Sequence, residues 1–156
     1  LGARLIINLE KLYLSLKKLD LKDDKIENYY KQSHKLGIVP KNSNKLKNKL
    51  FGIECNFEEL NGIDFKKGCY VGQENTARIK LKNKLLKRLL PVQLIEGEIY
   101  EDETININEV EIGKILINDE YPFALVKYMN ENFDKNKTYK SKNGVFKIFV
   151  PEWLKI

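Results

Sequence analysis

The sequence contains few of the residues that build a metal cage. It has two cysteines, Cys55 and Cys69, and a single histidine, His34. No C-x-x-C or H-x-x-x-H spacing occurs, so the ligand pattern of a structural zinc site is absent. An iron–sulfur cluster usually takes about four cysteine ligands. We therefore predict no self-contained metal site, and we expect no disulfide in a reducing compartment.

Long apolar stretches are also absent. No run approaches the roughly 18 to 20 apolar residues that a membrane-spanning helix needs. An apolar fraction of 42% is nevertheless enough for a folded core. We expect no membrane partner and a location in the cytoplasm, or in the mitochondrial matrix if the source is eukaryotic. Since the chain starts at Leu1 and its only methionine is Met129, we expect it to begin within a longer protein.

The charge of the chain is positive but not concentrated. The formal net charge is +6, and the 32% of residues that are charged include both signs. This balance permits an anionic partner, and it fits an ordinary solubilising surface equally. Residues 96–111 hold seven acidic residues and no basic one, which interrupts a continuous basic face. Direct nucleic-acid binding is therefore not expected, and only the net charge favours an RNA-binding module.

The first part of the chain contains one strong helical pattern. Apolar residues at three- and four-residue spacing predict a helix from about residue 24 to Leu36, ended by Gly37. The compact apolar run Leu5–Leu9 predicts a buried strand before it. The mixed spacing of residues 12–21 fits either a helix or a loop.

Two clusters in this part have both a structural and a functional interpretation. Tyr29, Tyr30 and His34 share the predicted helix, where they form either a ligand-facing cluster or the stripe that packs on the core. The Lys41–Lys49 segment is rich in Lys and Asn, which predicts an exposed, mobile loop. A phosphate or a polyglutamate tail is the alternative partner of that loop.

Past residue 85 the pattern changes to short, alternating or β-branched segments separated by Gly, Asn, Asp and Pro. These segments predict five strands: Leu89–Leu94, Ile105–Val110, Ile112–Ile117, Phe123–Tyr128 and Val145–Val150. Five short strands in this length indicate a small antiparallel barrel, on which we expect Trp153 to pack.

The densest group of unusual residues is Lys67–Glu74, which reads K-G-C-Y-V-G-Q-E. Gly68 and Gly72 permit a sharp turn, and the sequence after Gly72 predicts a helix to about Leu81. Cys69 follows Lys66 and Lys67 and precedes the helix start. Both neighbours favour the thiolate, the form that attacks electrophiles and binds metals. A buried structural thiol is the alternative.

This block resembles the YgfZ-type folate-binding proteins, which are relatives of the glycine-cleavage aminomethyltransferase and act in iron–sulfur protein maturation. The resemblance extends upstream to Glu54-Cys55-Asn56 and to Asn61–Phe65. It extends downstream to Thr76-Ala77-Arg78 and to the closing Pro151–Leu154. Aminomethyltransferases have a related loop that lacks the cysteine, so Cys69 favours the assembly branch.

The resemblance implies an α+β fold in two parts. Residues 1–84 would be the C-terminal part of an aminomethyltransferase-like folate-binding α/β body, with the N-terminal half absent. Residues 85–156 would be a small antiparallel β-barrel domain. The implied cofactor is tetrahydrofolate or a derivative, and the implied partners are the iron–sulfur assembly machinery or its client proteins.

The resemblance also implies site residues. Cys69 is the functional thiol, and no residue is assigned to a metal. The implied folate contacts are Glu54, Asn56, Lys67, Gly68, Tyr70, Gly72, Gln73, Glu74 and Arg78. A carboxylate such as Glu54 or Glu74 presents two acceptor oxygens to the donor edge of a pterin. Glu74 has two alternatives, capping its own helix or pairing with Arg78 one turn later.

Two functions of different classes follow. The first is a non-enzymatic, folate-dependent factor that supports maturation of 4Fe–4S proteins and thereby tRNA modification. The second is a folate-dependent transferase of one-carbon, aminomethyl units, in which a carboxylate or Cys69 assists. The sequence shows no acid–base constellation, so we favour the first.

Overall fold

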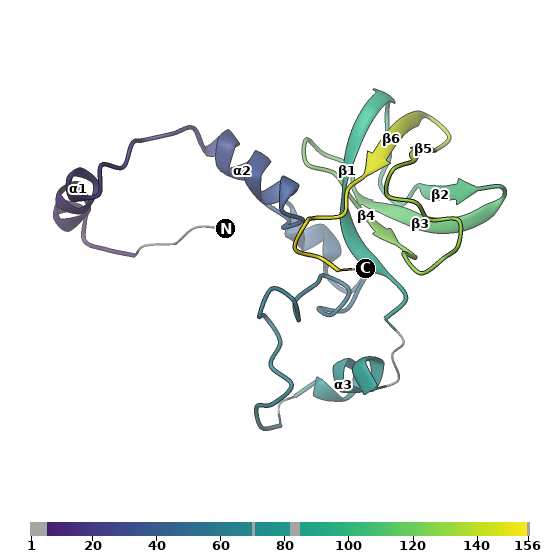
Figure 1. Cartoon of the computed structure of the whole chain (residues 1–156), viewed down its shortest axis with the longest axis horizontal. Coiled ribbons are helices and arrows are strands. Elements are labelled where there is room, and N and C mark those ends of the chain that lie inside the picture. Colours follow the sequence, from purple (N-terminus) through teal and green to yellow (C-terminus); the bar gives the residue numbers. More distant parts are fainter. Residues whose placement is uncertain (1–5, 70, 82–84, 156) are drawn as a thin grey trace.

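The computed structural model describes residues 6–69, 71–81 and 85–155 (Figure 1). Helices occupy the first part of the chain and strands the second. The helices are α1 (Leu9–Lys18), α2 (Ile26–Lys35), the short 3-10 helix η1 (Ser43–Leu46) and α3 (Gln73–Leu81). The strands are β1 (Arg88–Gly97), β2 (Thr104–Ile107), β3 (Val110–Ile117), β4 (Phe123–Val126), β5 (Thr138–Lys140) and β6 (Gly144–Ile148).

The strands form an antiparallel sheet in the order β2-β3-β4-β1-β6-β5. The sheet curls until its outer strands, β2 and β5, come into contact. At this seam the backbone N–H of Lys142 donates to the carboxylate of Glu103 at 2.8 Å. The sheet is therefore a nearly closed six-stranded barrel, and the predicted antiparallel barrel is confirmed.

Each of the five predicted strands is present, and β5 was not predicted. Strand β5 has three residues, of which only Tyr139 is buried. The alternation of buried and exposed residues is therefore too short to predict a strand from the sequence. The Tyr139 ring stacks between Phe133 and Phe146, with centroids 6.1 and 6.3 Å away. Its hydroxyl donates to the carbonyl of Asp134 at 2.6 Å. The Tyr139 side chain therefore anchors the strand in the core, and the strand also pairs with β6.

The barrel interior is filled by β-branched and aromatic side chains, which suit a pleated, half-buried surface. Its buried members are Leu90, Val92, Ile99, Ile105, Ile112, Ile115, Ala124, Val126, Tyr139, Phe146, Ile148 and Leu154. Trp153 packs against this cluster, as predicted. A second cluster, built on Leu89, Leu116, Ile117 and Phe123, lies under the segment that precedes the barrel.

The predicted strand Leu5–Leu9 is wrong for its described residues. Residues 6–8 are irregular, and Leu9 begins α1, whose first turn is capped by Asn8. The Asn8 side-chain oxygen accepts from the N–H of Glu10 at 2.9 Å, which favours a helix start over an extended strand. Leu5 lies outside the described residues. The ambiguous segment 12–21 is helical as far as Lys18, and α1 has no buried residue and stands away from the barrel (Figure 1).

Helix α2 confirms the predicted helix and joins the barrel at its C-terminal end. Gly37 follows it with a φ of 71°, a conformation that favours glycine. The carbonyl of Leu36 accepts from the indole N–H of Trp153 at 3.0 Å. A Cβ atom on Gly37 would lie 2.6 Å from Cγ of Pro151. The end of α2 is therefore packed tightly against the end of the chain.

The Lys41–Lys49 segment is mostly exposed, as predicted, and it also contacts the barrel through Lys45, Leu46 and Lys49. Lys45 and Lys49 both pair with Glu101, at 3.2 and 2.8 Å. The hydrogen bond to Glu101 raises the pKa of Lys49, and the same bond lowers the pKa of Glu101. Leu46 packs on the second cluster. The acidic stretch of residues 96–111 therefore contains an ion-pair partner of the basic Lys41–Lys49 segment.

Among the described residues, no helix combines the length and the apolar character that crossing a membrane requires.

Replacing Gly37 by alanine should destabilise the junction between α2 and the chain end. The new Cβ meets a proline ring, and the left-handed conformation strains a non-glycine residue, so we expect a loss of about 1–3 kcal/mol in the free energy of unfolding. Urea unfolding measures this loss. Gly68→Ala is the matched control, since a Cβ there meets no atom within 4 Å. Equal stability of the two variants would contradict the packing described.

Candidate functional site

Residues 51–62, here called the turn region, form a series of tight turns beside the barrel. Backbone bonds close the turns, from Phe57 N–H to Gly52 O at 3.2 Å and from Gly62 N–H to Phe57 O at 2.6 Å. Ile53 is completely buried. Asn56 has a φ of 61°, in the left-handed region where asparagine is one of the tolerated residues. The turn region is therefore folded without regular secondary structure.

Asn56 and Arg88 join the turn region to the first barrel strand. The Asn56 amide donates to the carbonyl of Leu89 at 3.0 Å and accepts from the Arg88 guanidinium at 3.1 Å. A second Arg88 nitrogen pairs with the carboxylate of Glu59. Asn56 is fully buried, and Arg88 is 6% exposed. Asn56 therefore faces inward, and its predicted contact with folate stays a prediction.

Glu54 and Cys55 lie in the same turns. The Glu54 carboxylate accepts from the N–H of Phe51 at 2.8 Å, and its carbonyl accepts from the N–H of Leu89 at 2.8 Å. The Cys55 side chain packs against the second apolar cluster. Burial, together with the charge of Glu54, raises the pKa of Cys55 to about 12. Cys55 is therefore a structural thiol with very little thiolate at neutral pH.

Residues 66–72, here called the cysteine loop, follow the turn region after a short connection, and the described ones, 66–69 and 71–72, are all exposed. Cys69 is exposed, and a Cβ at Gly68 or Gly72 would meet no atom within 4 Å. Gly72 has a φ of 85°, which explains the glycine directly before α3. The predicted Gly72 turn is confirmed. Lys67 is exposed as well, and Tyr70 lies outside the described residues.

Helix α3 carries the remaining predicted contacts. Gln73 is its first residue and is half-buried. The Glu74 carboxylate pairs with the Arg78 guanidinium at 2.5 Å, which confirms the predicted ion pair one turn along the helix. Lys80 pairs with Glu58 and lies over the ring of Phe65, 5.6 Å from its centroid. The helix is thereby attached to the turn region.

The structure divides the predicted folate contacts into two groups. Glu54 and Asn56 lie in the turn region with their polar atoms engaged by the backbone or by Arg88. The described members of Lys67–Arg78 lie on the exposed cysteine loop and α3. None of these residues lines the cavity of about 1470 Å³ or the cavity of about 590 Å³ that lie elsewhere in the structure. The described members of both groups therefore lie outside these two cavities.

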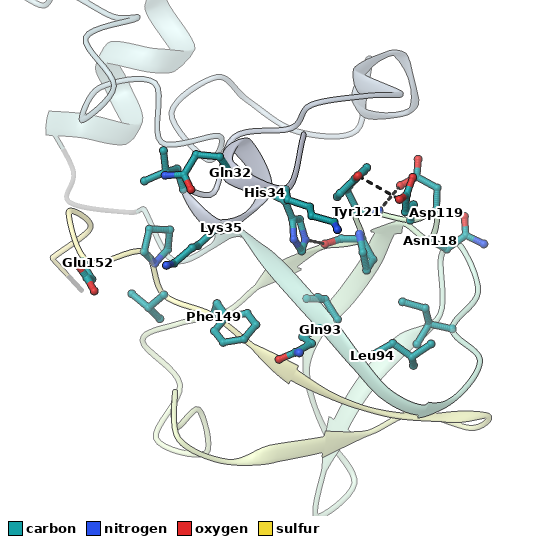
Figure 2. Close-up of a pocket in the computed structure, with 18 of the residues that line it drawn as sticks. Gln32, His34, Lys35, Gln93, Leu94, Asn118, Asp119, Tyr121, Phe149 and Glu152 are labelled. Atoms are coloured by element: carbon teal, nitrogen blue, oxygen red, sulfur yellow. Dashed lines mark hydrogen bonds between the residues drawn. The ribbon is translucent and has the colours of Figure 1, made fainter. Parts of the chain in front are cut away.

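The larger cavity, here called the barrel groove, was not predicted. It has a volume of about 1470 Å³ and lies between α2, the second half of β1, the 118–122 loop and residues 149–153 (Figure 2). His34 forms part of its wall, where its Nε2 contacts the carbonyl of Pro122 at 2.9 Å. The His34 ring meets Phe123 edge-on with a centroid distance of 5.1 Å, and burial lowers the pKa of His34.

The aromatic cluster on α2 was the available signal for this groove. His34 contacts the buried Phe123 and also lines the groove, and Tyr30 contacts Tyr121 with a centroid distance of 5.9 Å. Both interpretations of the cluster, core packing and ligand contact, stay predictions. Tyr29 stays 49% exposed. No sequence pattern brings residues 149–153 next to α2, which is why the groove as a whole was missed.

Among the described residues, no group of three or more His, Cys, Asp or Glu side chains is placed to hold a metal ion.

Comparison with known proteins gives one consistent name. The chain is 35% identical over 112 residues to a protein of Dictyostelium discoideum named iron–sulfur cluster assembly factor IBA57 homolog, mitochondrial. Proteins of the same name match from Neurospora crassa, at 37% over 90 residues, and from Aspergillus oryzae, at 45% over 62 residues. These alignments cover 67%, 58% and 40% of this chain.

The same alignments cover 27%, 20% and 14% of the three relatives. The chain therefore corresponds to a minor part of each of them. No family model matches the sequence. The similarity agrees with the resemblance that the Lys67–Glu74 block carries to iron–sulfur assembly proteins.

The two thiols should differ strongly in reactivity. With a pKa of about 12, roughly one part in ten thousand of Cys55 is thiolate at pH 8, and its burial slows access further. Cys69 is exposed. We expect iodoacetamide at pH 8 to modify Cys69 at least about a hundredfold faster than Cys55, measured by mass spectrometry of the peptide that carries each cysteine. Similar rates would contradict the burial of Cys55.

Proposed function

We propose that this chain contributes to an iron–sulfur cluster assembly factor. The observation that carries the proposal is the similarity to mitochondrial assembly factors together with a solvent-exposed cysteine in the resembling block. Thiolates are the usual protein ligands of iron–sulfur clusters. A thiol that projects from a loop is accessible to a partner, whereas the half-buried Cys55 packs against the second apolar cluster.

Within this proposal, Cys69 acts as a single contact and not as a complete cluster site. Two cysteines and one histidine in the sequence cannot supply a full ligand set. The cluster would therefore be cargo that is shared with a partner or client protein, which supplies the other ligands. Open space around Gly68 and Gly72 leaves room for that partner's surface beside Cys69.

We further propose that tetrahydrofolate, or a derivative, binds near the cysteine loop. The support is the K-G-C-Y-V-G-Q-E block and its exposed acceptor, Glu74, whose carboxylate is oriented by Arg78. Because Cys69, Glu74 and Arg78 are exposed, a pterin at this loop would need a second surface to cover it. The 4Fe–4S proteins would be the clients, and the effect on tRNA modification would follow from one cluster-dependent enzyme. If the source is eukaryotic, the chain would take part in cluster assembly in the mitochondrial matrix.

The role of Cys69 can be tested in cells that lack their own assembly factor. We expect the full-length protein to restore the activity of a 4Fe–4S enzyme, and the Cys69→Ser variant to leave it at the level of cells without the protein. Cys55→Ala is the matched control, since it removes the other thiol, and it should restore activity. Immunoblots establish equal protein levels. Full restoration by Cys69→Ser would refute the assigned role.

Folate binding requires a separate measurement. Replacing Glu74 by alanine removes a charged acceptor, whose hydrogen bonds are worth about 1.5–3 kcal/mol, so tetrahydrofolate should bind the full-length variant roughly 10 to 100 times more weakly. Titration calorimetry measures the affinity. Glu131→Ala, at an exposed position outside the block, should leave it unchanged. Unchanged affinity in Glu74→Ala would remove Glu74 from the site.

A further inference from the structure

Lys80 joins the two ends of the cysteine loop. Phe65 is the last residue before this loop, and α3 begins directly after it at Gln73. The Lys80 ammonium, on the last turn of α3, pairs with the carboxylate of Glu58 and lies 5.6 Å from the centroid of the Phe65 ring. One side chain on the helix that follows the loop therefore contacts both the turn region and the residue that precedes the loop.

Helix α3 depends on such attachment for its structure. It has nine residues, whereas an isolated helix shorter than about 12–15 residues is marginal in water. None of these nine described residues is buried, and Figure 1 shows the helix well away from the barrel. The ion pair between Glu74 and Arg78 lies within the helix, so it does not attach the helix to the rest of the chain. We therefore expect α3 to unwind when it detaches from the turn region.

The two ends of the cysteine loop have defined conformations. At the entry, the Asp64 carboxylate accepts from the N–H of Lys66 at 2.8 Å. At the exit, Gly72 has a φ of 85° directly before α3. Between them Cys69 is exposed, and a Cβ at Gly68 would meet no atom within 4 Å. The position of Cys69 relative to the barrel therefore follows mainly from where the ends of the loop are held.

A contact between Cys69 and a partner is favoured when the thiol is already in place. Binding that must first order a flexible loop loses affinity to the conformational entropy of that loop, and a loop held at both ends loses less. The Lys80 side chain is half-exposed, and exposed ion pairs and cation–π contacts are individually weak. The contacts of Lys80 are therefore expected to change the order of the loop in a graded way and to leave the barrel folded.

We propose that Lys80 is a positioning residue for Cys69. It holds α3 on the turn region, which fixes both ends of the cysteine loop and presents the thiol to a partner from a defined place. The proposal rests on the role of Cys69 in the proposed function. It adds that the partner contact of Cys69 depends on the attachment of α3, whereas the reactivity of the thiol itself does not.

Native-state hydrogen exchange of the full-length protein measures the attachment. The two contacts of Lys80 should favour the attached state by a factor of roughly 3 to 30, so the amides of residues 77–81 should exchange faster by that factor in Lys80→Gln. Lys80→Arg keeps the charge and should exchange like the unmodified protein. Lys135→Gln, at an exposed position before β5, is the matched control and should also leave these amides unchanged.

A charge swap shows whether the contact with Glu58 is the cause. Lys80→Glu places two carboxylates together, so the amides of residues 77–81 should exchange faster than in Lys80→Gln. The double variant Glu58→Lys and Lys80→Glu restores an ion pair with the charges exchanged, and it should recover protection relative to Lys80→Glu. Equal exchange in Lys80→Glu and in the double variant would overturn the proposal, as would unchanged exchange in Lys80→Gln.

The functional arm uses cells that lack their own assembly factor, at equal protein levels. The activity of a 4Fe–4S enzyme should fall about threefold or more with Lys80→Gln and should return with Lys80→Arg. Iodoacetamide should modify Cys69 at the same rate, within about twofold, in both variants, because the thiol is exposed whether or not α3 is attached.

The outcomes separate this proposal from the function on which it rests. Full enzyme activity with Lys80→Gln, in cells where Cys69→Ser gives none, would contradict the positioning role alone. A changed alkylation rate of Cys69 in Lys80→Gln would show that Lys80 acts on the chemistry of the thiol instead of its position. Full activity with Cys69→Ser would refute the proposed function itself, and with it the need to position this thiol.

Discussion

A buried guanidinium connects the two parts of this protein. Arg88 lies at the start of the first barrel strand and is 6% exposed. Its charge is paired with Glu59 of the turn region, and Asn56 accepts a hydrogen bond from it. A charge in this position is costly unless it is paired, and removal of one partner of a buried pair typically costs about 3–5 kcal/mol. The turn region therefore cannot leave the barrel without exposing or stranding this charge. The attachment of the turn region to the barrel determines where the cysteine loop begins.

This attachment separates a rigid part of the molecule from an exposed one. The barrel is held by a continuous apolar core and by antiparallel strand pairs, three of which contain a register shift. The cysteine loop begins at the turn region and returns through α3, which is attached by Lys80 to Glu58. Cys69 is exposed on this connection, while Cys55 is half-buried in the turn region and has a raised pKa. One thiol is thus accessible to a partner, and the other is part of the fold.

The parts of the fold that local patterns determine could be predicted from the sequence. Alternating β-branched residues identified five strands, and helical spacing with a terminal glycine identified α2. The strand predicted at Leu5–Leu9 is wrong for its described residues, because a short apolar run does not by itself determine whether a neighbouring sheet buries it. The attachment of Lys45 and Lys49 to Glu101, and of Trp153 to Leu36, joins residues distant in sequence. The barrel groove depends on such contacts, so no local pattern indicates it.

The central claim is that the Asn56–Arg88 contact holds the turn region on the barrel. Native-state hydrogen exchange of the full-length protein with Asn56→Ala tests it most directly. The amides of residues 53–57 and of Leu89, which bonds to Glu54, should lose about tenfold or more in protection, the effect of about 1–3 kcal/mol for stranded buried polar groups. Amides in the barrel core, such as those of Ile115 and Val126, should lose much less. Unchanged protection of residues 53–57 would contradict the account.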